Sequence, residues 1–584
     1  MAESLKKRGF GEGREDDGTA RFDPGRVLAR LVEAASASHA RAVAFLAVCA
    51  VLFFLPGLFH IPPIDRDEAR FAQATKQMVE TGDFVDIRFQ NEVRYKKPVG
   101  IYWLQAAAVQ TASALGLPNA HIRIWVYRLP SLAGAIGAVL LVYWAAAAFV
   151  TRRGAVLAGL LMCASLLLGA EARLAKTDAA LLFTVVAAMG ALARVYLVWQ
   201  RGEDPPRRPW VLPFVFWTAL AGGILLKGPL ILMFVALTVG MLAVLDRSVA
   251  WLWRLRPLAG VAWMLLLVLP WFVAILLKSG DTFLADSVGG DMLSKIASGQ
   301  ESHGAPPGLY FLLFWVTFWP GAPLAGRAAP AVWRARREPA TQFLLAWLVP
   351  SWIVFELVVT KLPHYVLPLY PAIAILIVMV LEGRALSQAA WLRRGASWWF
   401  VLPLLFAVGA IVGVMALTLQ PTFLAWPFFA AALVFGLFAW WLFDEAEAER
   451  STLCGIAASL CLSVALYGVV MPKLAPLFPS VEVARALRSV ECVGPRSAAA
   501  GFHEPSLVFM TGTSTLLTDG PSAADFLRPG GCRFALIESR QERAFALRAE
   551  AIGLRYDILR RVEGYNFSQG RAISIAIFHT VGTR

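Results

Sequence analysis

Long apolar blocks separated by short polar segments dominate the pattern of this chain of 584 residues. A helix needs about 20 mostly apolar residues to cross a bilayer, and many of the blocks approach that length. Clear examples are residues 42–59, 129–150, 212–226, 258–277, 343–359 and 401–419. Counting every block predicts a polytopic α-helical membrane protein with roughly thirteen transmembrane helices.

Composition supports this prediction and narrows the classes of function. Hydrophobic residues make up 58% of the chain and charged residues 16%, which is too little polar surface for a soluble protein of this length. The net charge is +14, yet no basic tract is interleaved with aromatic residues. We therefore expect membrane lipids as partners and no nucleic acid.

The distribution of Lys and Arg predicts the orientation. With the N-terminus in the cytoplasm, sixteen arginines fall in cytoplasmic loops, and six Lys or Arg residues fall in the short outer loops. This asymmetry follows the positive-inside rule. We predict a cytoplasmic tail (1–40), a transmembrane domain (41–471) and an outer, periplasmic C-terminal segment (472–584), in the inner (cytoplasmic) membrane.

The outer segments have structure of their own. Loop 60–127 is long and charged, and its block 99–117 is expected to be a juxtamembrane helix, because counting it as a span would invert every later loop. Loop 279–307 is a second outer loop. Within 472–584, apolar runs 534–537 and 573–578 predict strands, and 481–490 and 540–551 predict helices of a small α/β domain.

Two cysteines fall in this C-terminal segment. Cys492 and Cys532 can pair if the segment lies outside the cytosol, where thiols oxidise. Two free cysteines are an equally good interpretation.

The densest polar patch, DRDEARFAQATKQMVETGDF at 65–84, follows the first block. Asp65, Asp67 and Glu68 could all cap a helix there, and we favour capping for Asp65 and Glu68. Asp67 shares a helix face with Arg70, and a capping acid needs no arginine beside it. For Asp67 we therefore favour a functional role.

Lys96 and Lys97, in RYKKPVGIYW, suit a lipid phosphate held at headgroup depth. Ordinary contact of lysines with lipid headgroups is the alternative. Ionisable residues inside membranes cost about 2.5–3.5 kcal/mol each and usually have a role. Those predicted at outer span ends or in an outer loop are Asp178, Lys227, His303, Lys361 and His364, with Tyr365 beside them.

Other chemistries lack their motifs. The chain has no Walker A loop, HExxH, CxxC pair or GxSxG elbow, so nucleotide-driven transport and zinc hydrolysis are unsupported. His303 and the acids are not at metal-ligand spacing in sequence. We expect no metal cofactor, although residues distant in sequence could assemble a site.

An ordered set of motifs resembles the aminoarabinose-transferase family, which is related to protein O-mannosyltransferases. The pieces are Asp67-Glu68-Ala69-Arg70, Thr81-Gly82-Asp83-Phe84, Tyr95-Lys96-Lys97-Pro98, Asp178, Lys227-Gly228, residues 361–368 (KLPHYVLP) and residues 564–571 (GYNFSQGR). The resemblance implies a GT-C fold with a periplasmic active site and an inverting transfer from an undecaprenyl-phosphate-type donor.

The same resemblance implies the site residues. Asp67 would be a catalytic carboxylate, and Lys97 and Tyr365 would contact the carrier phosphate. Arg70, Tyr95, Asp178, Lys227 and His303 would line the same cavity. We group Asp178 and Arg70 with the catalytic residues, Lys96 and Lys227 with the phosphate-binding ones, and Glu68, Lys361 and His364 with the cavity. We expect a monomer and a lipid or glycan acceptor.

Two departures put the substrates in question. Members of the family commonly have Glu before the lysine, where this chain has Lys96, and an Arg soon after the loop histidine, where His303 precedes Gly-Ala-Pro-Pro. The sugar and acceptor therefore need not be aminoarabinose and lipid A. A transporter or flippase of lipid-linked sugars is the main alternative, and a scaffold whose outer domain binds a partner is the second.

Overall fold

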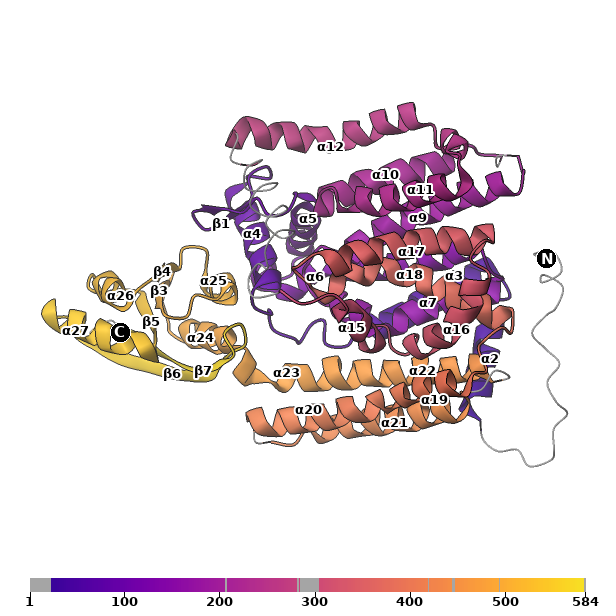
Figure 1. Ribbon diagram of the computed structural model, residues 1–584. Helices are drawn as coiled ribbons and strands as arrows, with labels where there is room; N and C mark the ends of the chain where they lie inside the picture. The colour runs from indigo at the N-terminus through magenta and orange to yellow at the C-terminus, as the bar shows by residue number, and fades with distance from the viewer. Residues whose placement is uncertain are drawn as a thin grey trace.

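The larger part of the molecule is a bundle of apolar helices, and the smaller part is a C-terminal α/β domain (Figure 1). The computed structural model describes residues 23–204, 207–280, 283, 304–418, 420–443, 447–492 and 494–581. The helices of the bundle are α2 (Pro24–Ala35), α3 (His39–Phe54), α6 (Ile124–Ala146), α7 (Arg152–Ala164), α8 (Leu166–Glu171), α9 (Asp178–Gln200), α10 (Val211–Lys227), α11 (Leu230–Asp246), η2 (Ala250–Leu255), α12 (Pro257–Ser279), α15 (Leu309–Thr317), α16 (Ala322–Arg334), α17 (Pro339–Leu357), η5 (Pro363–Leu369), α18 (Tyr370–Glu382), α19 (Ala390–Ser397), η6 (Trp398–Val401), α20 (Leu402–Thr418), η7 (Phe423–Ala425), α21 (Trp426–Trp441), α22 (Ala448–Ser463), η8 (Val464–Val470) and α23 (Met471–Lys473).

The prediction of a multi-span membrane protein is confirmed, but the count of thirteen is not. Within the described residues, eight helical segments are long and apolar enough to cross a membrane, or nine if α15 and α16, bent by 119°, form one span. Three further apolar helices, α3, α10 and α11, are shorter. The blocks differ from the spans because breaks within apolar sequence divide it into shorter helices. Gly228-Pro229, for example, separates α10 and α11, which have 17 residues each and are shorter than the candidate spans.

The bundle has a centre and a periphery. In the apolar 18-residue stretch of each span, 83% of the residues are buried in α9 and 89% in the span formed by η5 and α18, but only 22% in α12. A helix that is apolar on every side can either face lipid or lie enclosed among other helices. Polar residues at the starts of α9 and η5 therefore lie deep within the protein rather than at its lipid surface.

The segment after α3 lies at one end of the bundle. Its elements are α4 (Asp67–Thr81), β1 (Arg88–Phe89), β2 (Glu92–Val93), α5 (Gly100–Ala114) and η1 (Ala120–Ile122). The helix expected at 99–117 is present as α5, and it is not among the candidate spans. Figure 1 shows α4 between the bundle and the C-terminal domain, and α2 at the opposite end of the bundle.

The C-terminal domain is a mixed five-stranded sheet of order β4-β3-β5-β7-β6, with β3 parallel to β4 and β5, and β7 antiparallel to β5 and β6. Its elements, preceded by η9 (Ala475–Leu477), are α24 (Pro479–Arg488), β3 (Arg496–Ala500), α25 (Pro505–Thr511), β4 (Leu516–Thr518), α26 (Gly520–Leu527), β5 (Arg533–Glu538), α27 (Ser539–Ala551), β6 (Tyr556–Asn566) and β7 (Arg571–Thr580).

The four elements predicted for this domain are confirmed as β5, β7, α24 and α27. The central strand β5 is apolar at successive positions because both of its faces are covered. Phe534 and Leu536 pack with α24 and α25, while Ala535 and Ile537 pack with α26 and α27. Cys492 and Cys532 form a disulfide with their Cα atoms 5.8 Å apart, so the paired alternative holds in the structure.

Candidate active site

Five buried residues form an ion cluster where the two most enclosed spans begin. Asp178 is the first residue of α9, and Lys227, the last residue of α10, donates a hydrogen bond to Asp178 Oδ1. Lys176 Nζ lies 3.2 Å from Glu171 Oε1 and 3.7 Å from Asp178 Oδ2. His364 lies between the two acids, with Nδ1 3.6 Å from Glu171 Oε1 and Nε2 3.7 Å from Asp178 Oδ1.

The charges of this cluster balance within it. Two carboxylates face two ammonium groups, so each buried ion has a partner of opposite sign. Glu171, Asp178 and His364 also stand close enough together to hold a metal ion. However, Lys176 and Lys227 already contact the carboxylate oxygens, and a metal would meet two positive charges. We therefore interpret the cluster as an ion-pair network.

One polar atom of the cluster is left over. Among the described residues, Glu171 Oε2 is buried and has no hydrogen-bond partner. A buried carboxylate oxygen without a donor is costly. It can accept a hydrogen bond from a hydroxyl or ammonium group of a bound ligand.

The residues expected to bind phosphate approach this cluster from three elements. Lys227 Nζ lies 5.2 Å from the centre of the Tyr365 ring, which packs edge-on against His364. Lys97 acts electrostatically on His364, and Asp67 acts on Lys176. The structure thus brings residues from five distant stretches of the sequence to one end of the bundle.

Asp67 differs from Asp178 in its surroundings. It is the exposed first residue of α4, and Arg70 follows one turn later on the same helix. Asp178, in contrast, is only 4% exposed and lies against three basic side chains. Asp67 is therefore the carboxylate that an incoming molecule can reach, and Asp178 is the one that holds lysines in place.

Glu68, next to Asp67, forms a buried pair with Arg128 of α6. Arg128 Nε donates to Glu68 Oε1 at 2.7 Å and Nη2 donates to Oε2 at 2.8 Å. The other guanidinium donors go to the carbonyls of Leu58, Ile61 and Pro62. Glu68 also accepts the amides of Ile64 and Ala175. The start of α4 is thereby fixed to α6 and to the turn that carries Lys176.

Capping does not describe Asp65 or Glu68. The N-terminus of α4 has no side-chain cap, and Glu68 is occupied by Arg128. Asp65 instead accepts a hydrogen bond from the amide of Ser506, at 3.0 Å, in the first turn of α25. It therefore joins the bundle to the C-terminal domain. Burial raises the pKa of Asp65 to about 7, and the nearby charge of Glu504 adds to this rise.

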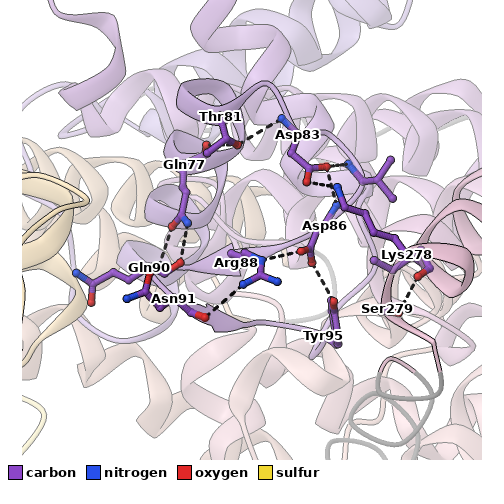
Figure 2. A network of polar contacts seen from close by, with 12 residues as sticks. Gln77, Thr81, Asp83, Asp86, Arg88, Gln90, Asn91, Tyr95, Lys278 and Ser279 are labelled. Carbon is purple, nitrogen blue, oxygen red and sulfur yellow. Dashed lines mark hydrogen bonds and ion pairs between the residues drawn. The ribbon is translucent and has the colours of Figure 1, made fainter.

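Polar contacts shape the loop that carries Lys96 and Lys97 (Figure 2). Asp86 accepts hydrogen bonds from Tyr95 Oη at 2.9 Å and from Arg88 Nε at 2.7 Å. Asp83 pairs with Lys278 at the end of α12. Burial, followed by the hydrogen bond to Asp86, raises the pKa of Tyr95 to about 12. Tyr95, which precedes Lys96 in the sequence, is thus held by Asp86, and among the described residues no hydrogen bond joins it to the ion cluster.

One expected cavity residue, Lys361, has another role in the structure. Lys361 is buried and donates to the carbonyls of Phe355, Glu356 and Val358, which end α17, so it satisfies a helix C-terminus. His303 falls outside the described residues.

Three residues of the site were not found by sequence reasoning. Glu171 and Lys176 precede the predicted Asp178 in the run EARLAKTD, and Arg128 interrupts an apolar run. Charges in such places are themselves a signal, because membrane proteins rarely bury them without partners.

Several known proteins are similar to this chain in sequence. Residues 43–281 match the family described as dolichyl-phosphate-mannose-protein mannosyltransferase. A curated relative, the undecaprenyl phosphate-alpha-4-amino-4-deoxy-L-arabinose arabinosyl transferase of Aeromonas salmonicida, is 30% identical over 368 residues, which cover 59% of this chain and 62% of the relative. The protein of the same name from Edwardsiella ictaluri is 26% identical over 529 residues, or 82% of this chain and 87% of that one.

The fold has a solved counterpart. ArnT from Cupriavidus metallidurans bound to undecaprenyl phosphate superimposes with a TM-score of 0.70 at 19% identity, covering 92% of this chain and 98% of that one. The expected GT-C fold and the resemblance to the aminoarabinose-transferase family are confirmed. The match to the Aeromonas relative spans about three fifths of that relative's length.

Proposed function

We propose that this chain, a multi-span membrane protein with the fold of ArnT, is a glycosyltransferase that takes its sugar from an undecaprenyl-phosphate-type carrier. The acceptor would be an envelope molecule such as lipid A, lipopolysaccharide, another lipid or a protein. The reaction would occur at the periplasmic face of the inner membrane, with inversion at the anomeric carbon. The observation that carries the proposal is the buried, charge-balanced cluster that holds Lys227 beside Tyr365, with Lys97 near enough to act electrostatically on His364.

The proposed chemistry is substitution at the anomeric carbon. The bond from that carbon to the phosphate oxygen breaks, and polyprenyl phosphate leaves with the electron pair. Cations that meet the developing phosphate charge speed this departure. Lys97 and Lys227 are the cations we assign to this role, with Lys96 as a further candidate. Asp178 holds Lys227 in place.

The acceptor decides what Asp67 does. A hydroxyl acceptor must lose a proton as it attacks, and the exposed Asp67 is the candidate general base. A phosphate acceptor is already anionic, and Asp67 would then orient it or Arg70. Asp67→Asn should abolish transfer in the first case and weaken it in the second.

The proposal is tested in cells and with purified protein. Mass spectrometry of envelope lipids and glycans should show a sugar modification that disappears without this chain and returns with the wild-type protein, but not with Lys97→Ala. An envelope identical in both strains would contradict the proposal. Purified protein in liposomes should convert undecaprenyl-phosphate-linked aminoarabinose, or another sugar carried by that lipid, to free carrier only when an acceptor is added.

A flippase of lipid-linked sugars remains the second candidate. Such a protein should place its polar residues near the bilayer midplane, in both halves of a repeat. Here Asp178 and Lys227 stand at helix ends, which favours a reaction at one face. Movement of the intact lipid-linked sugar across liposomes, without cleavage, would favour the flippase instead.

A further inference from the structure

A second polar site lies at the opposite ends of α9 and α10 from the ion cluster. A cavity of about 360 Å³ opens there between α9, α10 and η2. Its walls include three arginines, Arg194, Arg254 and Arg256. Arg194 follows Asp178 by sixteen residues along α9, or about 24 Å at 1.5 Å per residue. We call this cavity the arginine pocket.

Each of the three guanidinium groups lies over a tryptophan ring. The distances from the guanidinium carbon to the ring centre are 3.9 Å for Arg194 and Trp144, 5.1 Å for Arg254 and Trp199, and 3.5 Å for Arg256 and Trp210. Such stacking orients a guanidinium group while leaving its edge for hydrogen bonds.

Among the described residues, no ion pair neutralises the three arginines of the pocket. In the part of the chain that the structure describes, no carboxylate lies within 4.0 Å of these three guanidinium groups. The nearby acids are engaged elsewhere: Glu203 lies 4.0 Å from Arg201, and Asp246 accepts from Gln200 and Gln342.

One donor in the pocket is buried and unused. Arg254 donates through Nη2 to the carbonyl of Glu203 at 3.1 Å, but its Nη1 is buried without a hydrogen-bond partner among the described residues. An orphaned donor of a charged group is expensive, so an acceptor brought by a ligand would relieve it. Together with the charge of the three arginines, this donor favours a ligand with negatively charged oxygens.

The remaining walls are apolar and include Val195, Val198, Leu212 and Pro213. Exposed Trp199, Trp210 and Trp253 around the pocket mark the depth of the membrane interface. Guanidinium groups beside an apolar wall at this depth match an anionic phospholipid, whose phosphate and acyl chains are joined in one molecule. The loops of this end carry most of the loop arginines, as expected for the cytoplasmic leaflet, where anionic lipids are abundant.

We propose that the arginine pocket binds the phosphate of an anionic phospholipid from the leaflet at this end of the bundle. Arg254 and Arg256 bind the phosphate oxygens, Arg194 adds charge, and the apolar wall receives the upper part of an acyl chain. The site is separate from the proposed transfer reaction, and its test does not depend on that reaction.

Native mass spectrometry of the purified, delipidated protein tests the proposal, with phosphatidylglycerol, phosphatidylcholine and inorganic phosphate as probes. Wild-type protein should retain phosphatidylglycerol at least tenfold better than phosphatidylcholine. The double variant Arg254→Gln/Arg256→Gln should lose this preference. Arg394→Gln, an exposed arginine of α19, is the matched control and should retain it.

Three outcomes would overturn the proposal: equal retention of both lipids by the wild type, unchanged preference in the double variant, or displacement of phosphatidylglycerol by millimolar phosphate, which would identify a site for a free anion. The unfolding temperature without added lipid shows whether the double variant is folded. If it is not, the charge-retaining variant Arg256→Lys and the neutral Arg256→Gln are compared singly, and equal preference in the two contradicts the proposal.

Discussion

Asp178 lies against Lys227, Lys176 and His364. To separate its chemical role from its structural role, variants must be measured for both transfer activity and stability. A buried ion left without its partner typically destabilises a protein by about 3–5 kcal/mol, whereas removing both charges is often close to neutral. A single and a double substitution in the cluster should therefore differ in stability while both lack activity.

We expect Asp178→Asn to lower both stability and transfer, because Lys227 is left uncompensated. The double variant Asp178→Asn/Lys227→Met should recover most of the lost stability but no transfer, since the cation for the leaving phosphate is gone. Thermal unfolding in detergent and a transfer assay measure the two effects. Recovery of transfer in the double variant would show that neither residue takes part in the reaction.

Lys97→Ala should reduce kcat by about 10²–10³, the usual effect of removing one donor that stabilises developing charge. Lys96→Ala should weaken donor binding if Lys96 replaces the arginine that the aminoarabinose-transferase family commonly has soon after the loop histidine. Lys473→Ala, an exposed lysine of α23, is the matched control and should leave both kinetic parameters unchanged. Unchanged kinetics of Lys97→Ala would remove that residue from the site.

Individual residues show how much of the site could be predicted from the sequence. Asp178, Lys227 and His364 were predicted because charged side chains at the ends of apolar blocks are rare and usually have a role. Their partner Glu171 was missed, since a lone acid before a turn has no distinctive spacing. Lys361 was assigned to the cavity by its motif, but motif order cannot reveal that its ammonium group turns back toward the carbonyls of α17.

At the scale of elements, the start of α4 depends on one buried pair. Arg128 uses all five of its donors, and Glu68 accepts four hydrogen bonds. Because Ala175 is one of the donors, the same pair fixes the positions of Asp67 and of the neighbouring Lys176. This network is a support for the site.

We expect Glu68→Gln to destabilise the protein by about 3–5 kcal/mol, because Arg128 then remains buried without a counter-charge. Equilibrium unfolding in mixed micelles measures the loss, and Glu92→Gln, an exposed acid of β2, is the control. Transfer should fall more through kcat than through KM, since the lysines proposed to bind the donor remain in place while Asp67 is displaced. Wild-type stability of Glu68→Gln would contradict the role assigned to the pair.

The sequence pattern predicted individual helices and strands better than it predicted the number of membrane spans. Strands β5 and β7 were predicted from short apolar runs, and helices α24 and α27 from helical periodicity. Helix α5 was predicted as a juxtamembrane helix from the distribution of basic residues among the loops. The spans were miscounted because apolar composition does not show where a helix breaks. Pro-containing turns such as those at Pro229 and Pro320 divide apolar sequence into helices shorter than a full span.

At the scale of the whole molecule, the C-terminal domain is held by direct contacts with the first loop as well as by its covalent connection to α23. Gln73 donates to Thr513 at 2.8 Å, and Lys76 donates to the carbonyl of Phe509 at 3.1 Å. The Phe509 ring packs edge-on against Tyr127. Asp65 adds a titratable contact with Ser506. The domain thus holds α4 in place from the side opposite the bundle.

The attachment should depend on pH through Asp65. Burial raises its pKa from the ordinary 3.8 to about 7, so the docked domain keeps a proton that the undocked carboxyl releases. Docking is therefore strongest at low pH and weakens as the pH rises from about 4 to about 7, with no further change above that window. Asp65→Asn keeps an acceptor for Ser506 but cannot ionise, and it should remove this dependence.

Unfolding temperatures of wild type and Asp65→Asn, measured from pH 5 to pH 8, test this prediction. The variant should be the more stable of the two at pH 8, and the difference should shrink toward pH 5, where the wild-type carboxyl is mostly protonated. Asp557→Asn, an exposed aspartate of β6 in the same domain, should follow the wild type at every pH. A constant difference between Asp65→Asn and wild type would mean that Asp65 is ionised in the docked domain, and the contact with Ser506 would then be an ordinary charged cap of α25.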